Sequence, residues 1–221
     1  MGTDNLFHKR KAKSSKALKR RAARREAYRK ILIVCEGQKT EPNYFEEARE
    51  YYRLNTVNVE VRGDCGSDPM SIVNFAKQRF REEKDAGDPF EQVYCVFDKD
   101  GHSTYAQAIN TLGSSTPTGI YFAINSVPCF EYWLLLHFVY STRPYTALPG
   151  NSSGHQVLTE LKNYIPHYEK GSKAIFSDLI GQLAQAKHYA EKALKESRLN
   201  QTDNPSTHVH RLVQTLQDLK S

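Results

Sequence analysis

The sequence ILIVCEG, residues 31–37, decides the fold class of this chain. Its first five residues are apolar and mostly β-branched, which is typical of a strand that is buried on both faces of a sheet. A second run of this kind, VYCVF at residues 93–97, is followed directly by DKDG. Strands of this type belong to sheets that are covered by helices on both sides.

Helical and extended patterns alternate around these two strands. Such alternation implies right-handed crossovers and a mainly parallel sheet, so we expect an α/β domain. The flanking elements are predicted, in chain order, as a helix over residues 41–53, a strand over 57–61, a helix that begins at Asp68-Pro69, a helix capped by Ser103, a strand over 119–124 and a mostly buried helix over 129–138.

The composition changes after residue 140, where a polar loop rich in Pro, Gly and Ser begins. Helical spacing of apolar residues then predicts three helices, over residues 155–165, 173–198 and 207–219. We therefore divide the chain into a basic arm over residues 1–29, an α/β domain over 30–140 and a helical C-terminal extension over 141–221.

The net charge of +6 is concentrated near the N-terminus. Residues 9–30 hold twelve Lys or Arg residues and one acid, which leaves 19 basic and 24 acidic residues elsewhere. A dense basic segment suits DNA or RNA, because each neutralised phosphate releases counterions. The alternative is a solvated tail that only aids solubility. The arm residues that we expect to contact nucleic acid are Lys19, Arg20, Arg21, Arg24 and Arg25.

Cysteine usage and hydropathy bear on the compartment. The four cysteines form no C-x-x-C pair. The sequence shows neither a signal peptide nor an apolar stretch long enough to cross a bilayer. We therefore expect a reduced, cytoplasmic protein with no membrane partner.

Three acids follow the two buried strands. Glu36 ends the first strand, and Asp98 and Asp100 end the later one. Residues i and i+2 of an extended segment point to the same face, so both aspartates should project together while Lys99 points away. Carboxylates that meet at the carboxyl edge of a sheet repel each other unless a cation lies between them. Mg²⁺, or Mn²⁺, suits such a site, and the lack of His or Cys ligands disfavours Zn²⁺.

Two further acids are candidates for the same site. Glu41 lies at the start of the first predicted helix, where it would either reach a second metal ion or face the positive end of the helix dipole. Glu131 lies inside an otherwise apolar helix, where a carboxylate is costly without a partner. We expect Glu131 to act as a metal or water ligand, or to pair with a base.

Four other features carry weaker expectations. Lys39 would neutralise a phosphate or be an ordinary solvated lysine. His102 would transfer a proton or, as we favour, cap a helix N-terminus. His137 reads as a core histidine with satisfied hydrogen bonds. The segment NPST at residues 204–207 predicts a helix start, with a substrate contact as the alternative.

Five segments carry a family resemblance. They are ILIVCEG (31–37), KTEPNYF (39–45), FDKD (97–100), VPCFEYWLL (127–135) and NPST (204–207). The pattern of EG after one strand and DxD after another resembles the Toprim domain of topoisomerases, bacterial primases and OLD-family nucleases. Over about residues 28–215, the chain more specifically resembles the RloB/AbiLii family, which is associated with restriction and phage-defence loci. The resemblance implies a metal-dependent nuclease of Toprim type in antiphage defence, and it leaves the target open.

Three rival functions remain. The string DKDG at residues 98–101 also resembles the first motif of haloacid-dehalogenase phosphatases, with Asp98 as nucleophile and Asp100 as general acid. That motif should follow an early strand and be completed by a downstream acidic pair, which this sequence lacks. A second rival is a non-catalytic nucleic-acid-binding component of a defence complex. A third is an effector controlled by a separate ATPase sensor protein, since the chain has no P-loop of its own.

Overall fold

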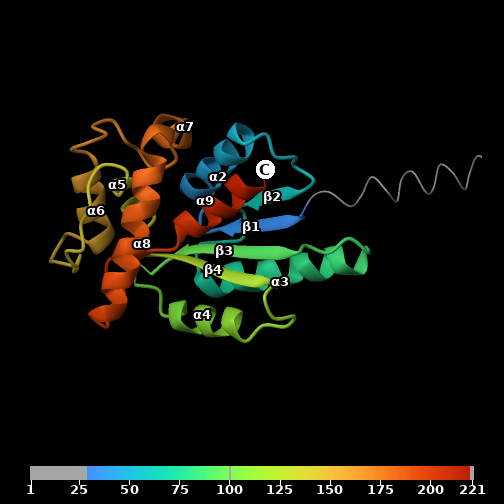
Figure 1. Ribbon diagram of the computed structural model, residues 1–221. Helices are drawn as coiled ribbons and strands as arrows, with labels where there is room; N and C mark the ends of the chain where they lie inside the picture. The colour runs from blue at the N-terminus through green and yellow to red at the C-terminus, as the bar shows by residue number, and fades with distance from the viewer. Residues whose placement is uncertain (1–28, 100, 220–221) are drawn as a thin grey trace, which may run out of the picture.

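The computed structural model describes residues 29–99 and 101–219, and Figure 1 shows its helices and strands. The expected basic arm and Asp100 lie outside these residues. The elements are, in chain order, β1 (Ile31–Cys35), α2 (Thr40–Tyr51), β2 (Val59–Arg62), α3 (Pro69–Asp85), β3 (Gln92–Asp98), α4 (Tyr105–Gly113), β4 (Tyr121–Val127), α5 (Glu131–Leu135), α6 (Ser153–Leu161), α7 (Ile175–Leu179), the 3₁₀ turn η1 (Ile180–Gln182), α8 (Leu183–Leu199), β5 (Ser206–Thr207) and α9 (Val209–Asp218).

The sheet confirms the predicted fold class. Within the described residues it has five strands in the order β2-β1-β3-β4-β5, all parallel except β5, which is antiparallel to β4. β1 and β3 are neighbours, and Cys35 pairs with Val96. The carboxyl ends of these two strands therefore lie side by side. An α/β fold with a mainly parallel sheet flanked by helices is consistent with the Toprim-like architecture that the sequence resembles.

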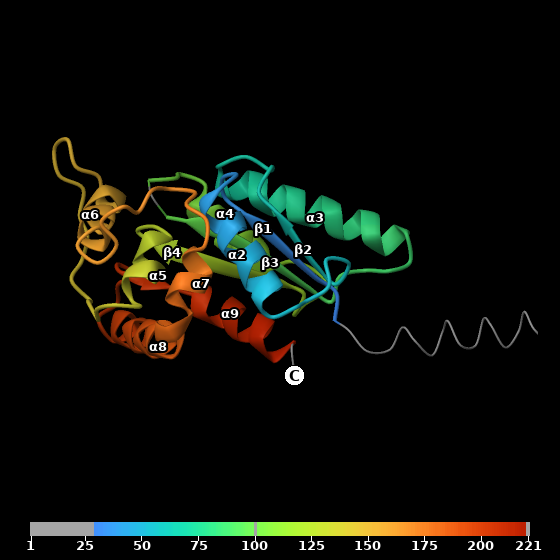
Figure 2. The same ribbon diagram turned by 90° about the horizontal axis from the view of Figure 1, so that it is seen from above.

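Helices cover both faces of the sheet, as the complete burial of β1 requires. Ile31 and Ile33 belong to a large apolar cluster with α2, α5, α7, α8 and α9. Leu32 and Val34 belong to a second cluster with α3 and α4. Figure 2 shows α3 and α9 on opposite sides of the sheet. Because both faces are buried, the site-bearing strand ends have a rigid support.

The C-terminal third joins the same core. Residues from α6 to α9 contribute to the larger apolar cluster, and β5 adds a strand to the sheet. In Figure 1, α5 to α8 lie near the carboxyl ends of the parallel strands, whereas α9 runs back along the sheet. The division of the chain at residue 140 stays a prediction.

Several local predictions differ from the structure. The predicted helix over 173–198 is interrupted by η1, although its apolar stripe is buried on both sides of the break. Ser206 and Thr207 form β5, because their backbones pair with Val127 and Ser126 of β4. The helix α9 starts two residues later, and the hydroxyl of Thr207 accepts a hydrogen bond from the backbone N–H of Val209. The predicted helix over 129–138 shortens to α5, which is followed by turns.

The start of α3 was predicted correctly, and that of α4 was not. The side chain of Asp68 accepts hydrogen bonds from the backbone N–H groups of Met70 and Ser71, with Pro69 in the first turn. The N-cap of α4 is Thr104, one residue after the expected Ser103. In the part of the chain that the structure describes, no helix combines the length and the apolar character that crossing a membrane requires.

Candidate functional site at the carboxyl edge of the sheet

Glu36 lies where β1 ends and is held by both of its carboxylate oxygens. Oε2 accepts a hydrogen bond of 2.9 Å from the backbone N–H of Asp98, and Oε1 lies 3.1 Å from Nε2 of His102. The next residue, Gly37, has a φ of +71°, a conformation that glycine adopts readily and that turns the chain away from the strand. Glu36 is thereby fixed toward the end of β3, as the sequence predicts.

His102 has a different position from the one that we favoured. It does not cap α4, because that helix begins at Tyr105 with Thr104 as its N-cap. Its imidazole instead contacts Glu36. When Glu36 is ionised, its carboxylate only accepts hydrogen bonds, and Nε2 of His102 is then the donor in this contact. His102 therefore orients the Glu36 carboxylate. The two residues are 66 positions apart in the sequence.

Asp98 is tied to the segment that follows β4. Its Oδ2 accepts a hydrogen bond of 3.1 Å from the backbone N–H of Phe130, the residue before α5. The same segment supplies Glu131, the first residue of α5, whose side chain is only 2% exposed. The carboxyl ends of β3 and β4 thus bring Asp98 and Glu131 to the same region as Glu36.

Glu131 has two partners from the C-terminal extension. Its Oε1 accepts a hydrogen bond of 3.4 Å from the hydroxyl of Tyr168 and lies 3.4 Å from the Nζ of Lys170. A basic partner was one of the two expectations for this buried acid. Glu41, 9% exposed, lies in the first turn of α2, in agreement with its predicted position at a helix start.

The electrostatics show that these acids share one environment. Burial raises the pKa of Asp98 well above its usual range, and repulsion from Glu41, Glu131 and Glu36 adds to the shift. Burial also raises the pKa of Glu41 to about 8, again with repulsion from Glu131 and Glu36. The carboxylates of Asp98 and Glu41 are therefore costly to ionise beside the others, and a cation would relieve that cost.

An open pocket lies between the acids, with a cavity volume of about 460 Å³. Four of the predicted site residues line this pocket, namely Glu36, Lys39, Glu41 and Asp98. Glu131 does not line it, but Glu131 forms an ion pair with Lys170, which does. The lining residues are Glu36, Gly37, Gln38, Lys39, Thr40, Glu41, Ser67, Asp98 and Lys170.

The pocket meets one of the two requirements of a metal site, which are suitable donor atoms and a complete set of ligands. Among residues 29–99 and 101–219, no group of three or more His, Cys, Asp or Glu side chains is arranged closely enough to hold one. The donors that line the pocket are carboxylate oxygens, which suit Mg²⁺ or Mn²⁺, and Mg²⁺ commonly takes few protein ligands and keeps its waters. Asp100, the third predicted ligand, lies outside the described residues. The donor chemistry fits, and a closed ligand set stays a prediction.

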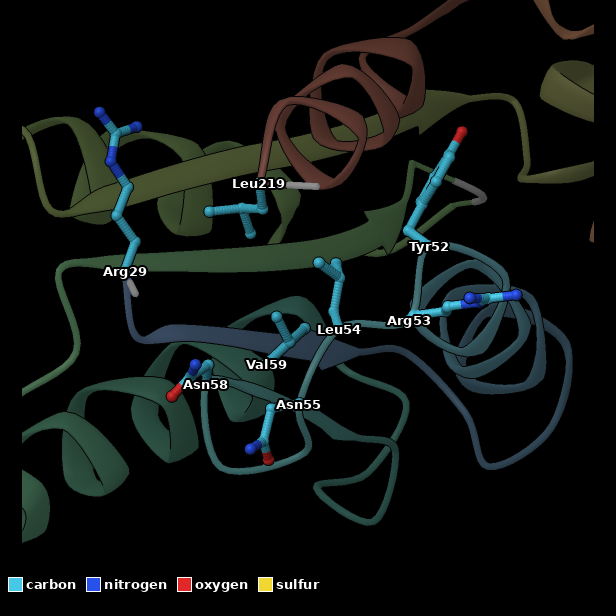
Figure 3. A pocket seen from close by; sticks show the side chains of 8 residues that line it. All are labelled: Arg29, Tyr52, Arg53, Leu54, Asn55, Asn58, Val59 and Leu219. Atoms are coloured by element: carbon cyan, nitrogen blue, oxygen red, sulfur yellow. The ribbon is translucent and has the colours of Figure 1, made fainter. Parts of the chain in front are cut away.

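A second pocket, of about 400 Å³, lies at the opposite end of β1. Figure 3 shows Leu54, Val59 and Leu219 meeting in its centre, with Arg29 and Arg53 on either side. None of the described residues that line it is an acid, so we do not consider it as a metal site. Arg29 precedes β1 and Glu36 follows it, so the basic arm joins the described structure at the end of β1 that is remote from Glu36. The lining residues are Arg29, Tyr52, Arg53, Leu54, Asn55, Asn58, Val59 and Leu219.

Tyr168 and Lys170 are the site residues that the sequence did not reveal. They come from a loop between α6 and α7, which carries no motif and begins more than thirty residues after Glu131. His137, expected in the core, is 1% exposed there, but only its Nδ1 has partners, the carbonyl oxygens of Trp133 and Leu134. Its Nε2 is buried with no partner among the described residues.

Comparison with known proteins gives one match. A family model described as RloB-like protein matches residues 31–216, which is most of the chain and nearly all of its described part. No curated protein and no solved structure matches.

Proposed function

Since the chain belongs to the RloB-like family, we propose that it is a metal-dependent nuclease that hydrolyses phosphodiester bonds of DNA or RNA in antiphage defence. The family is one that the sequence resembles, and the α/β fold is consistent with a Toprim-like architecture. The proposal adds the chemistry, which rests on the acids at the carboxyl edge of the sheet.

The observation that carries the proposal is the convergence of Glu36 and Asp98. They end neighbouring parallel strands and are joined by a hydrogen bond of 2.9 Å. Glu41 and Glu131 approach the same point from α2 and α5 and raise the pKa of Asp98. Proteins rarely gather buried acids without a cation or a proton to share, and phosphodiester substrates bring oxygen ligands for Mg²⁺.

Each acid has a proposed role. Glu36 and Asp98, together with Asp100, would hold Mg²⁺ or Mn²⁺, and the chemistry that the ion supplies when bound is Lewis-acid polarisation of a phosphate oxygen. His102 and the Asp98 N–H keep the Glu36 carboxylate oriented, as partners of metal ligands usually do. Glu36 or Glu131 would take a proton from the attacking water, and Glu41 would serve a second ion.

Two partners belong to the same proposal. The basic arm, including Lys19, Arg20, Arg21, Arg24 and Arg25, would bind the nucleic-acid backbone, while Lys39 would contact a phosphate in the pocket. A separate ATPase sensor would release the activity on infection. An unrestrained nuclease would harm its own cell, and this chain lacks a P-loop.

The test is cleavage of end-labelled single-stranded DNA, duplex DNA and RNA by the full chain, with Mg²⁺ or Mn²⁺ and with EDTA. We expect cleavage that requires the ion and is lost in Asp98→Ala, while Asp85→Ala, which removes an exposed acid at the end of α3, keeps it. Binding of nucleic acid with no cleavage under any condition would instead favour the non-catalytic alternative.

A further inference from the structure

The loop between α6 and α7 is anchored to the rim of the acid pocket at its Gly171 peptide. The N–H of Gly171 donates a hydrogen bond of 3.0 Å to Oγ1 of Thr40, and its carbonyl oxygen accepts one of 3.0 Å from Nδ2 of Asn43. Thr40 and Asn43 both lie in the first turn of α2. Two side chains of one helix turn therefore hold this peptide from both sides.

The loop also approaches the rim too closely for a larger residue at this position. Gly171 has a φ of +84°, and a Cβ added to it would lie 2.8 Å from Cβ of Lys39. Because the obstructing atom is next to the backbone, it cannot move aside as the end of a flexible side chain could. Gly171 is thus required both by its backbone conformation and by the contact.

Contacts on both sides of Gly171 extend the anchoring. After it, the carboxylate of Glu47, on α2, accepts hydrogen bonds from the backbone N–H groups of Ala174 and Phe176, the latter at 2.9 Å. Before it, the ring of Tyr168 is buried, and its hydroxyl reaches Glu131. The backbone of Lys170 is therefore fixed between two anchored neighbours.

Lys170 extends from this fixed backbone into the pocket. Its Nζ lies 3.4 Å from Oε1 of Glu131, yet its side chain is 64% exposed, and it lines the pocket together with Glu36, Glu41 and Asp98. An ammonium group has three donors, and the buried Glu131 engages it from one side. Because Lys170 lines the pocket, its remaining donors are available to a group bound there.

The charge of the pocket favours a fixed cation beside an anionic substrate. The pocket walls carry several carboxylates, which repel a phosphodiester, and repulsion grows as negative charge accumulates on the phosphate oxygens in the transition state. Lys39 and Lys170 are the lysines in the pocket lining among the described residues. Of these two lysines, Lys170 is the one that forms an ion pair with an acid of the site, Glu131.

We propose that Lys170 is a catalytic residue that donates to a non-bridging oxygen of the scissile phosphate. The ammonium keeps its proton throughout and forms no covalent bond. The inference rests on the proposed nuclease function and deepens it: the C-terminal extension, through the loop that carries Lys170, would complete the active site.

The test uses the full chain and three variants: Lys170→Met, Lys170→Arg and Lys173→Met. Lys173 is an exposed lysine of the same loop that does not line the pocket, so its variant controls for the loss of one charge. Three quantities are measured for each protein: the melting temperature, the dissociation constant for Mn²⁺, and the cleavage rate at saturating Mn²⁺ and oligonucleotide.

We expect Lys170→Met to cleave roughly 10²- to 10³-fold more slowly at saturation, as for the loss of one donor to a transition-state oxyanion. Its Mn²⁺ affinity should be unchanged or tighter, because a positive charge has left the site. Lys170→Arg should recover part of the rate, and Lys173→Met should match wild type.

Two outcomes would overturn the role of Lys170. One is a wild-type saturated rate in Lys170→Met. The other is a loss of melting temperature and Mn²⁺ affinity that accounts for the slower rate, which would make Lys170 a structural counter-ion of Glu131. Failure of the nuclease function has a different signature, namely that wild type itself neither binds Mn²⁺ at the pocket nor cleaves, and the inference would then fall with it.

Discussion

The backbone N–H of Asp98 donates a hydrogen bond of 2.9 Å to Oε2 of Glu36, across 62 positions of sequence. The contact places a carboxylate from the end of β1 over the end of β3, and it leaves the Asp98 carboxylate to accept from Phe130. The two carboxylates are therefore held by backbone N–H groups, one at the end of β3 and one in the residue before α5. A site held in this way should tolerate changes to its side chains without unfolding.

His102→Ala should weaken metal binding without removing a proposed ligand. Without the imidazole, the Oε1 atom of Glu36 loses its contact at 3.1 Å and the carboxylate is free to rotate. Loss of such an orienting partner typically costs 10- to 100-fold in metal affinity. Calorimetric titration with Mn²⁺ measures the change, with His155→Ala, which alters an exposed histidine in α6, as the control. Equal affinities in the two variants would remove His102 from the site.

Glu131→Gln should lose activity yet remain folded. The amide keeps the volume and still accepts the Tyr168 hydrogen bond, and the loss of one of several repelling carboxylates should leave the metal-free stability unchanged or slightly higher. Thermal unfolding and cleavage assays on the same preparation separate the two effects. A clearly lower melting temperature with intact cleavage would assign Glu131 to a purely structural pair with Lys170.

Deletion of residues 1–29 should weaken nucleic-acid binding and spare the chemistry. The arm joins β1 at the edge remote from the acids, so removing it should leave cleavage at saturating substrate intact. If about half of its basic residues contact phosphates, the slope of log affinity against log salt should fall by roughly 4–5 for a duplex, at about 0.9 per phosphate. An unchanged slope would mean that the arm serves another partner, and loss of saturated turnover would place the arm in the active site.

His137 should make the protein less stable in mild acid. Burial lowers the pKa of His137 to about 4, below the value near 6.5 of an unfolded chain. Between these values the unfolded state binds the proton and the folded state does not, so the free energy of unfolding falls as the pH drops from about 6.5 to 4. The shift corresponds to about 3 kcal/mol, since one pKa unit is about 1.4 kcal/mol.

Denaturant titrations of wild type and His137→Gln at several pH values check this. The acid cluster is common to both proteins, so its opposite pH dependence cancels in the comparison. The variant should lose less stability than wild type over that range. Parallel pH profiles would show that His137 is protonated in the folded protein.

The sequence predicted the part of the site that depends on strand ends. Parallel neighbours must finish at one edge, so the runs before Glu36 and Asp98 were enough to bring those residues together. Glu131 was conspicuous as a carboxylate in an apolar segment. Its partners could not be predicted, because Tyr168 and Lys170 lie in a polar loop whose position depends on tertiary contacts with Thr40 and Asn43.

Contacts between distant segments also explain the local errors. Ser206 and Thr207 were read as a helix start, a role their residue types favour, but pairing with β4 places them in the sheet. His102 was predicted to cap a helix because it lies just before one in the sequence, but its side chain contacts Glu36 instead. In both cases a contact with a segment distant in sequence outweighed the local preference.

The central claim is that the acids at this edge hold a divalent cation, and anomalous diffraction from a crystal soaked in Mn²⁺ tests it most directly. We predict an anomalous peak contacted by the carboxylates of Glu36 and Asp98, and no peak there in a crystal of Asp98→Ala soaked in the same way. Wild-type crystals with no peak between these two residues, at a Mn²⁺ concentration that supports cleavage, would contradict the account.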